Sequence, residues 1–247
     1  MVAIEGQSQL LFRAMRPTNA YEETMQRLLQ SIRLGMIPLG ERLPPERDLA
    51  SMLKVSRDTV REAISTLTEQ GFVVSKRGRY GGTFVVERLP DRAHSSQGDL
   101  TEHEINDIII LRRVLELGAV KEAAGRELRA AERAGLVEAL DACDGVVGED
   151  ARRLDSRLHV RIAELSGSPS LMEQVADLRT RLNSAFEVVP DLMPNLMNSD
   201  EQHHAIVAAI LAGRPDAAVR AMTEHLHGSE ALLRGYWATT TFSGGDD

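Results

Sequence analysis

The first third of the chain predicts three short helices followed by a β-hairpin. Apolar residues recur there at the spacing of an amphipathic helix in three segments, which Gly, Pro and capping residues separate. Two runs rich in β-branched and aromatic residues follow, on either side of a tip rich in Gly and Arg. The expected elements are helices at 19–35, 46–53 and 56–71 and strands at 72–75 and 83–86. This order is typical of a winged helix-turn-helix.

The remainder of the chain predicts helices only. Pro, Ser, Gly and charged residues crowd the segment after residue 88, which indicates a linker. The expected helices lie near 102–126, 130–146, 151–166, 170–187, 200–213 and 215–236, with a Pro-containing loop at 188–199. The expected fold class is therefore mainly α, with an N-terminal winged helix-turn-helix of three helices plus a β-hairpin, followed by an all-α antiparallel bundle of six to seven helices.

This pattern divides the chain into two domains joined by a linker. The 247 residues are enough for two compact domains with cores of their own. The expected parts are an N-terminal extension at 1–18, the winged helix-turn-helix at 19–88, the linker at 89–101, an all-helical domain at 102–237 and a disordered tail at 238–247.

Composition narrows the class of protein. Cys143 is the single cysteine, so disulfides and Cys-rich metal sites are excluded and a small buried thiol is expected. No stretch of about 18 uncharged apolar residues is present, and the N-terminus has no signal-peptide pattern. We therefore expect a soluble cytoplasmic protein that associates with the nucleoid when it binds DNA.

Charge is divided unevenly along the chain. The net charge is −8, which by itself argues against nucleic-acid binding. Residues 1–92 nevertheless hold 14 Lys and Arg against 11 Asp and Glu, a net charge of +3, whereas residues 93–247 carry −11. The N-terminal part alone is electrostatically suited to DNA.

The third expected helix presents two arginines one turn apart. Arg57 and Arg61 adjoin its apolar stripe, so both can project from one exposed edge into a major groove. Guanidinium groups there suit guanine or phosphate, although ordinary solvated arginines would give the same pattern. Arg77 and Arg79 at the hairpin tip can reach a minor groove, unless the hairpin is only an exposed loop.

The helical part places charged groups where a core is expected. Arg112 shares a stripe with Ile105, Ile108 and Ile109, so its guanidinium points inward and needs a partner. Two interpretations stay open: a structural pair with Glu116, or an anchor for the carboxylate of a ligand.

Three expected helices aim metal-capable groups at the same core. Asp155 and His159 are four residues apart on one apolar stripe, and His203 and His225 lie on the stripes of two later helices. This convergence favours a metal site built from nitrogen and oxygen ligands over hydrogen-bonded core histidines. His204 is the alternative to His203, which lies nearer the middle of its apolar stripe.

Residues 20 to 86 resemble the DNA-binding domain of the GntR superfamily. The resemblance is carried by the run Gly-Glu-Arg-Leu-Pro-Pro-Glu-Arg-Asp-Leu-Ala at 40–50 and by Val-Ser-Arg-Asp-Thr-Val-Arg-Glu-Ala at 55–63. It implies DNA contacts from Arg47, Arg57, Thr59 and Arg61 in the helix-turn-helix, and from Arg77 and Gly78 in the wing. The tip at 79–82 is longer than is usual in that family.

Residues 103–233 resemble the FCD ligand-binding domain of the FadR subfamily. Asp-Ser-Arg-Leu-His at 155–159, His-His-Ala-Ile-Val-Ala-Ala-Ile at 203–210 and Ala-Met-Thr-Glu-His at 221–225 carry this resemblance. It implies that Asp155, His159, His203 and His225 bind a divalent metal ion, and Arg112 matches the inward arginine of the family. Gln202 stands where an acid is frequent in the family.

These observations lead to one hypothesis about function. We expect a homodimeric transcription regulator, a repressor, that binds a palindromic operator in double-stranded DNA and contacts no membrane. A small carboxylate effector is expected to complete the coordination of the metal while it reaches Arg112. The expected metal is zinc, with nickel and manganese as alternatives.

Two other functions fit parts of the same pattern. A metal-dependent hydrolase could use three imidazoles and a carboxylate to activate water, although no further acidic base stands near these positions in the sequence. Alternatively, the helical domain could serve only for dimerisation. We expect no enzymatic activity.

Overall fold

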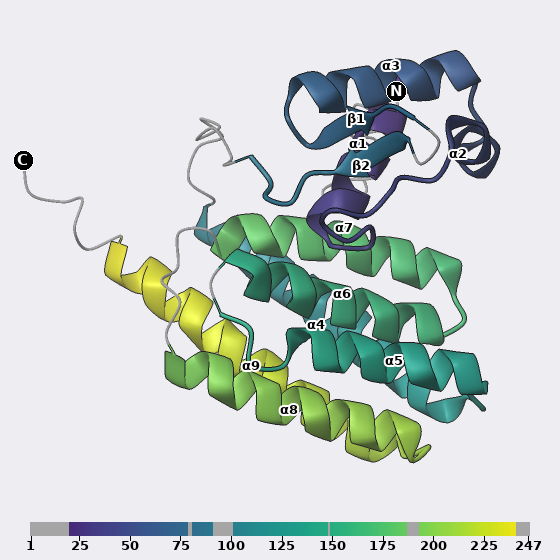
Figure 1. The fold of residues 1–247 in the computed structure, drawn as a ribbon. Helices are drawn as coiled ribbons and strands as arrows, with labels where there is room; N and C mark the ends of the chain where they lie inside the picture. The colour runs from purple at the N-terminus through teal and green to yellow at the C-terminus, as the bar shows by residue number, and fades with distance from the viewer. Residues whose placement is uncertain (1–19, 79–80, 91–100, 148, 187–192, 241–247) are drawn as a thin grey trace, which may run out of the picture. The chain divides into compact units, whose positions relative to one another are not determined.

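The computed structural model describes residues 20–78, 81–90, 101–147, 149–186 and 193–240. The expected N-terminal extension, most of the linker and Arg79 lie outside these residues. The chain divides into two compact units, one formed by 1–29 with 39–90 and the other by 30–38 with 91–247 (Figure 1).

The first unit contains three helices and a two-stranded antiparallel sheet. The elements are α1 (Ala20–Arg33), α2 (Glu46–Leu53), α3 (Arg57–Glu69), β1 (Val73–Lys76) and β2 (Gly82–Val85). In the hairpin Val73 lies opposite Val85 and Lys76 opposite Gly82, so both inner valines are buried. The face of α3 that holds Val60, Ala63 and Leu67 is also buried, because these residues recur at helical spacing.

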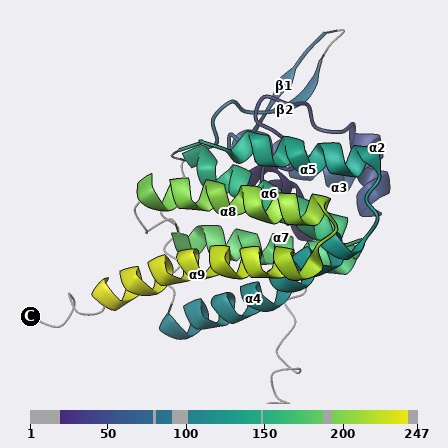
Figure 2. The same ribbon diagram turned by 90° about the horizontal axis from the view of Figure 1, so that it is seen from below.

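The second unit is a bundle of six described helices (Figures 1 and 2). They are α4 (Glu102–Gly125), α5 (Ala130–Cys143), α6 (Glu149–Leu165), α7 (Pro169–Phe186), α8 (Met193–Leu211) and α9 (Pro215–Thr240). The inner face of α4 packs against α6, α7, α8 and α9, so α4 contacts most of the bundle. The fold class predicted from the sequence is confirmed. None of the described helices is long and apolar enough to cross a membrane.

Two predicted boundaries in this unit are wrong. Residues 193–199 were expected in a loop, but α8 begins at Met193. Pro194 stands in the first turn of α8, where the missing N–H of proline removes no helical hydrogen bond. The disordered tail was expected from residue 238, but α9 continues to Thr240, since no Gly or Pro follows Gly235 in this stretch.

Residues 30–38 were expected in the N-terminal domain, but in the structure they group with the second unit. Leu34 is buried in a cluster with Ala119, Val160 and Val175 of that unit. The amide of Gln30 also donates to a carboxylate oxygen of Asp177 at 2.9 Å. The end of α1 is therefore part of the helical unit's packing.

The turn between α2 and α3 contains one strained residue. Lys54 ends α2 in the left-handed conformation, with φ of +56° and ψ of +40°, and it is the one non-glycine residue with positive φ among those described. In this conformation the Cβ crowds the backbone, which glycine avoids.

We expect Lys54→Gly to stabilise the N-terminal unit by roughly 0.5–1 kcal/mol, because glycine ends a helix in this conformation without the steric conflict. Denaturant unfolding followed by circular dichroism would measure the change. Lys54→Ala is the control: it removes the charge, keeps the Cβ, and should leave the midpoint nearly unchanged. A midpoint for Lys54→Gly at or below that of Lys54→Ala would contradict the strain argument.

Candidate functional site

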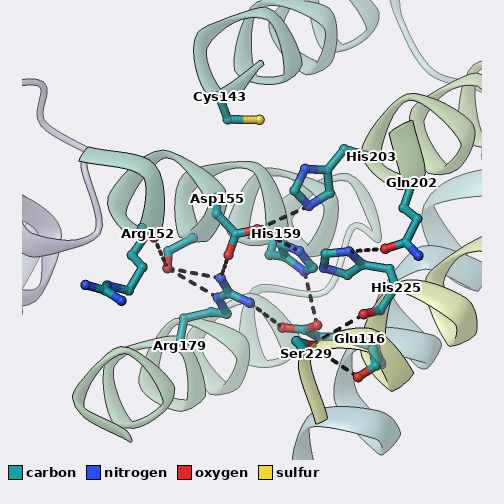
Figure 3. A network of polar contacts seen from close by, with 12 residues as sticks. Glu116, Cys143, Arg152, Asp155, His159, Arg179, Gln202, His203, His225 and Ser229 are labelled. Carbon is teal, nitrogen blue, oxygen red and sulfur yellow. Dashed lines mark hydrogen bonds and ion pairs between the residues drawn. The ribbon is translucent and has the colours of Figure 1, made fainter. Parts of the chain in front are cut away.

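One carboxylate and three imidazoles meet inside the second unit (Figure 3). α6 supplies Asp155 and His159, α8 supplies His203 and α9 supplies His225. One ligand atom of each lies within 4.8 Å of those of the other three. The structure thus brings together all four residues that the sequence analysis singled out.

Helical spacing explains how this cluster forms. Asp155 and His159 are one turn apart on α6, so both point to the same side of the helix. His203 shares the buried side of α8 with Ile206 and Ile210 and is only 3% exposed. The neighbouring His204 points outward instead: its side chain is 51% exposed, and its Nε2 lies 3.3 Å from Asp144.

Five of the six imidazole nitrogens of the cluster lack a hydrogen-bond partner among the described residues. Both ring nitrogens of His159 and of His203, and Nε2 of His225, are buried without one. Glu116 Oε2 lies 3.0 Å from His159 Nδ1, but outside hydrogen-bond geometry. His225 Nδ1 lies 3.3 Å from Oε1 of Gln202, a hydrogen bond that orients the ring. A buried nitrogen without a partner is unfavourable by about 1–3 kcal/mol, so an occupant that these nitrogens bind would relieve this cost.

Burial keeps the rings of His203 and His225 uncharged. It is the largest cause that lowers the pKa of His203 to about 3, and His159 and Arg179 nearby act in the same direction. Burial also holds the pKa of His225 well below its usual value. Neutral imidazoles with free lone pairs, together with a carboxylate, are the donor set that divalent transition metals prefer. The residues present therefore fit a metal ion.

The first unit presents a second candidate surface on α2, α3 and the hairpin. Ser56 caps α3, because its hydroxyl oxygen accepts from the backbone N–H of Thr59 at 3.0 Å. Arg57 is exposed at the start of α3 and forms no ion pair or hydrogen bond within the described part of the chain. Arg61 is 57% exposed and pairs with Glu46 at 3.2 Å and with Asp58 at 3.1 Å.

The other predicted DNA contacts are also accessible. Arg47 has a side chain that is 79% exposed and pairs only with Asp48 beside it. Arg77 and Gly78 are exposed where β1 ends. A Cβ added at Gly78 would meet nothing within 4 Å, and its φ of +111° is one that glycine adopts readily. Four exposed arginines therefore lie on one helix-turn-helix and its hairpin.

Comparisons with known proteins identify the family of this chain. The sequence profile of the bacterial regulatory proteins of the gntR family matches residues 20–85, and that of the FCD domain matches residues 107–228. The HTH-type transcriptional repressor NanR of Cronobacter sakazakii is 32% identical over 220 residues, which cover 83% of this chain and 82% of NanR. This chain belongs to the GntR family. Its C-terminal unit carries the FCD domain.

Other relatives and solved structures support the assignment. The HTH-type transcriptional regulator LutR of Bacillus subtilis is 27% identical, over 83% of this chain and 97% of LutR. A GntR regulator structure from Rhodococcus sp. RHA1 is 27% identical, with a TM-score of 0.50 over 88% of this chain and 99% of the other. Escherichia coli McbR/YncC shares the fold, with a TM-score of 0.55 at 20% identity over 89% of this chain and 99% of that one. This GntR-family protein is accordingly a transcription regulator.

A buried charge network supports the histidine cluster of the regulator (Figure 3). Glu116 on α4 accepts from Arg112 Nε at 3.2 Å, and Arg179 Nη1 on α7 lies 3.5 Å from its other oxygen. Arg179 also donates to Asp155. Burial opposes the ionisation of Glu116, but His159 and Arg112 outweigh it and hold the pKa of Glu116 well below its usual value. Glu116 is therefore a buried carboxylate between two guanidinium groups.

Arg179 was missed by the sequence analysis. It is 1% exposed, and burial lowers its pKa to about 10. The signal was present, because Arg179 falls on the apolar stripe of Val175, Leu178 and Leu182 in α7, as Arg112 does on that of α4. Two arginines on the core stripes of two helices, Arg112 on α4 and Arg179 on α7, together predict an acidic residue that both contact.

Arg112 forms the structural pair with Glu116 that was one of the two interpretations of its inward position. This pairing does not exclude the other interpretation, an anchor for the carboxylate of a ligand. Its Nε donates to Glu116, and its Nη1 donates to the hydroxyl of Ser229 at 2.6 Å. Arg112 also lines a small hollow, together with apolar residues that include Ile109, Leu226 and Leu233.

We expect Arg179→Ala to destabilise the second unit by about 3–5 kcal/mol, because the buried Glu116 and the partly buried Asp155 would have less compensating charge. Arg181→Ala is the matched control, two residues away on α7. Arg181 pairs with Asp107 at the surface, where both side chains are about half exposed, so its loss should change stability by less than about 1 kcal/mol. Chemical denaturation of the two variants would compare them, and equal effects would show that Arg179 is not a buried structural charge.

Proposed function

We propose that this protein is a ligand-responsive repressor that binds a palindromic operator as a homodimer and senses a small carboxylate at a divalent metal ion. The observation that carries the proposal is the cluster of Asp155, His159, His203 and His225, whose buried nitrogens lack partners, in a chain whose N-terminal helix-turn-helix exposes arginines. A protein of this kind acts in the cytoplasm, where its operator is. The relatives named above are regulators, which favours binding over catalysis.

The donor set favours zinc, with nickel or manganese as alternatives. Three imidazoles and one carboxylate oxygen are ligands that these ions accept, and zinc is the commonest occupant of such sites. When bound, the ion would attract a carboxylate oxygen from solution. Gln202 orients the ring of His225 through Nδ1 and leaves Nε2 free to bind the ion.

The residues around the cluster suit an anionic effector. Nη2 of Arg112 forms no hydrogen bond with any described residue, although Nε and Nη1 are both engaged. Arg112 also lines a small hollow, and we infer that Nη2 is the donor that contacts an effector carboxylate. Arg112 is thereby held in place by Glu116 and Ser229 while it retains one free donor.

DNA recognition is assigned to the exposed face of the first unit. We assign Arg57 and Arg61 to the major groove and Arg77 and Gly78 to the wing contact, with Arg47 and Thr59 at the phosphate backbone. Arg57 is the strongest candidate because it has no partner to give up within the described part of the chain. One helix-turn-helix covers a single half-site, so two-fold symmetry of the protein implies a palindromic operator.

We expect Arg57→Ala to weaken specific operator binding by roughly 1–3 kcal/mol, because a guanidinium contact in the groove is lost. Fluorescence anisotropy at fixed salt would measure it. Arg220→Ala, an exposed arginine on α9, is the control and should leave the affinity unchanged. If Arg57→Ala binds as tightly as the control, the assignment of α3 to the groove is wrong.

We expect the purified protein to contain close to one equivalent of metal per chain, and His159→Ala to lose it. Elemental analysis gives the content, and zinc at about 100 times its dissociation constant should stabilise the metal-free protein by about 2.7 kcal/mol, seen as a higher melting temperature. His204→Ala, which removes the exposed neighbour of His203, is the control and should retain the metal. Metal-free protein that added zinc does not stabilise would argue for a dimerisation domain only.

A further inference from the structure

The outer face of α4 is apolar in its middle although it is exposed. Ile110 is 60% exposed and Val114 is 66% exposed, one turn apart on the helix, and Leu111 and Leu117 beside them are half-buried. In Figure 2, α4 lies at the edge of the bundle beside α9. A helix that is apolar on both sides is usually covered on both sides.

Gly118 lies on this face, one turn after Val114. A Cβ added there would meet nothing within 4 Å, so packing inside the subunit does not require a glycine at this position. In the interior of a helix, glycine is less favourable than alanine by about 1 kcal/mol. Its advantage is that a second backbone can approach closely, which indicates an occupant outside the subunit.

The face is complementary to itself in the antiparallel direction. If two antiparallel copies of α4 cross at Val114, each residue before Val114 in one copy faces the residue that lies equally far after Val114 in the other copy. Ile110 then packs on Gly118 and Leu111 packs on Leu117, which matches large with small and apolar with apolar. Asp107 faces Lys121, which forms no ion pair within the described part of the subunit. The carboxylate of Asp107 uses only Oδ2 to accept from Arg181.

The parallel direction lacks this complementarity. It would place Asp107 against Asp107, Lys121 against Lys121 and the two glycines together, so that like charges repel. Charge and side-chain size therefore both favour the antiparallel arrangement about a two-fold axis, in which each contact occurs twice.

We propose that the outer face of α4, made of Asp107, Ile110, Leu111, Val114, Leu117, Gly118 and Lys121, pairs two copies of this chain in an antiparallel crossing centred on Val114. The inference builds on the homodimer of the proposed function and names the surface that forms it. In such a dimer, the inner face of α4 carries the residues of the charge network, and its outer face contacts the partner subunit.

The first experiment measures the mass of the wild type and of variants by sedimentation velocity at several concentrations. Val114→Glu would place two carboxylates together on the axis, so we expect the dimer dissociation constant to rise at least about 100-fold. Val137→Glu on α5, another exposed valine of the same unit, is the control and should remain dimeric. Asp107→Lys should weaken the dimer, and Asp107→Lys with Lys121→Asp should restore it.

The second experiment detects the axis directly and does not depend on a destabilising charge. In a Cys143→Ser background, Val114→Cys should form disulfide-linked dimers under mild oxidation, since the two residues meet each other, whereas Val137→Cys should not. A dimeric wild type with no cross-link at residue 114 and no effect of Val114→Glu would overturn this surface and leave the proposed function intact. A monomeric wild type at micromolar concentration and on its operator would overturn both.

Discussion

The constraint on which the second unit depends is the burial of three histidines beside a partly buried aspartate in one helical core. Each imidazole nitrogen that leaves water without gaining a hydrogen bond is unfavourable, and five such nitrogens belong to His159, His203 and His225. Burial lowers the pKa of His203 and of His225, so their rings stay unprotonated and available as metal ligands. Three helices align them with His159. The packing of α6, α8 and α9 is best understood as the frame that holds this donor set.

The charge network beneath the cluster makes that burial tolerable. Glu116 balances Arg112 and Arg179, and Arg179 in turn neutralises Asp155, so no charge in this part of the core stands alone. The same arrangement connects α4, α6 and α7 through side chains that must keep their positions. A ligand that draws Asp155 or Arg112 toward itself therefore alters contacts on all three helices.

Local pattern predicted most of the architecture, and it failed where the decisive partner is distant in sequence. Asp155 and His159 could be paired from their spacing, and Ser56 could be assigned as the cap of α3, because both features lie within one helical turn. Arg179 lies 63 residues from Glu116, and no periodicity within α7 says which acid it meets. The start of α8 was misplaced because Pro194 suits a first turn as well as a loop.

The two faces of α4 suggest how a signal could leave the sensor. Arg112 and Glu116 flank Val114 by two residues on each side, so they point almost opposite to it on the helix. An effector changes DNA affinity only if it binds two arrangements of the dimer with different affinity. With the charge network on its inner face and the partner on its outer face, a small rotation of α4 would alter effector contacts and subunit packing together. In the proposed dimer, a single helix would then couple the cluster of histidines and Asp155 to the spacing of the two DNA-binding units, with no separate relay.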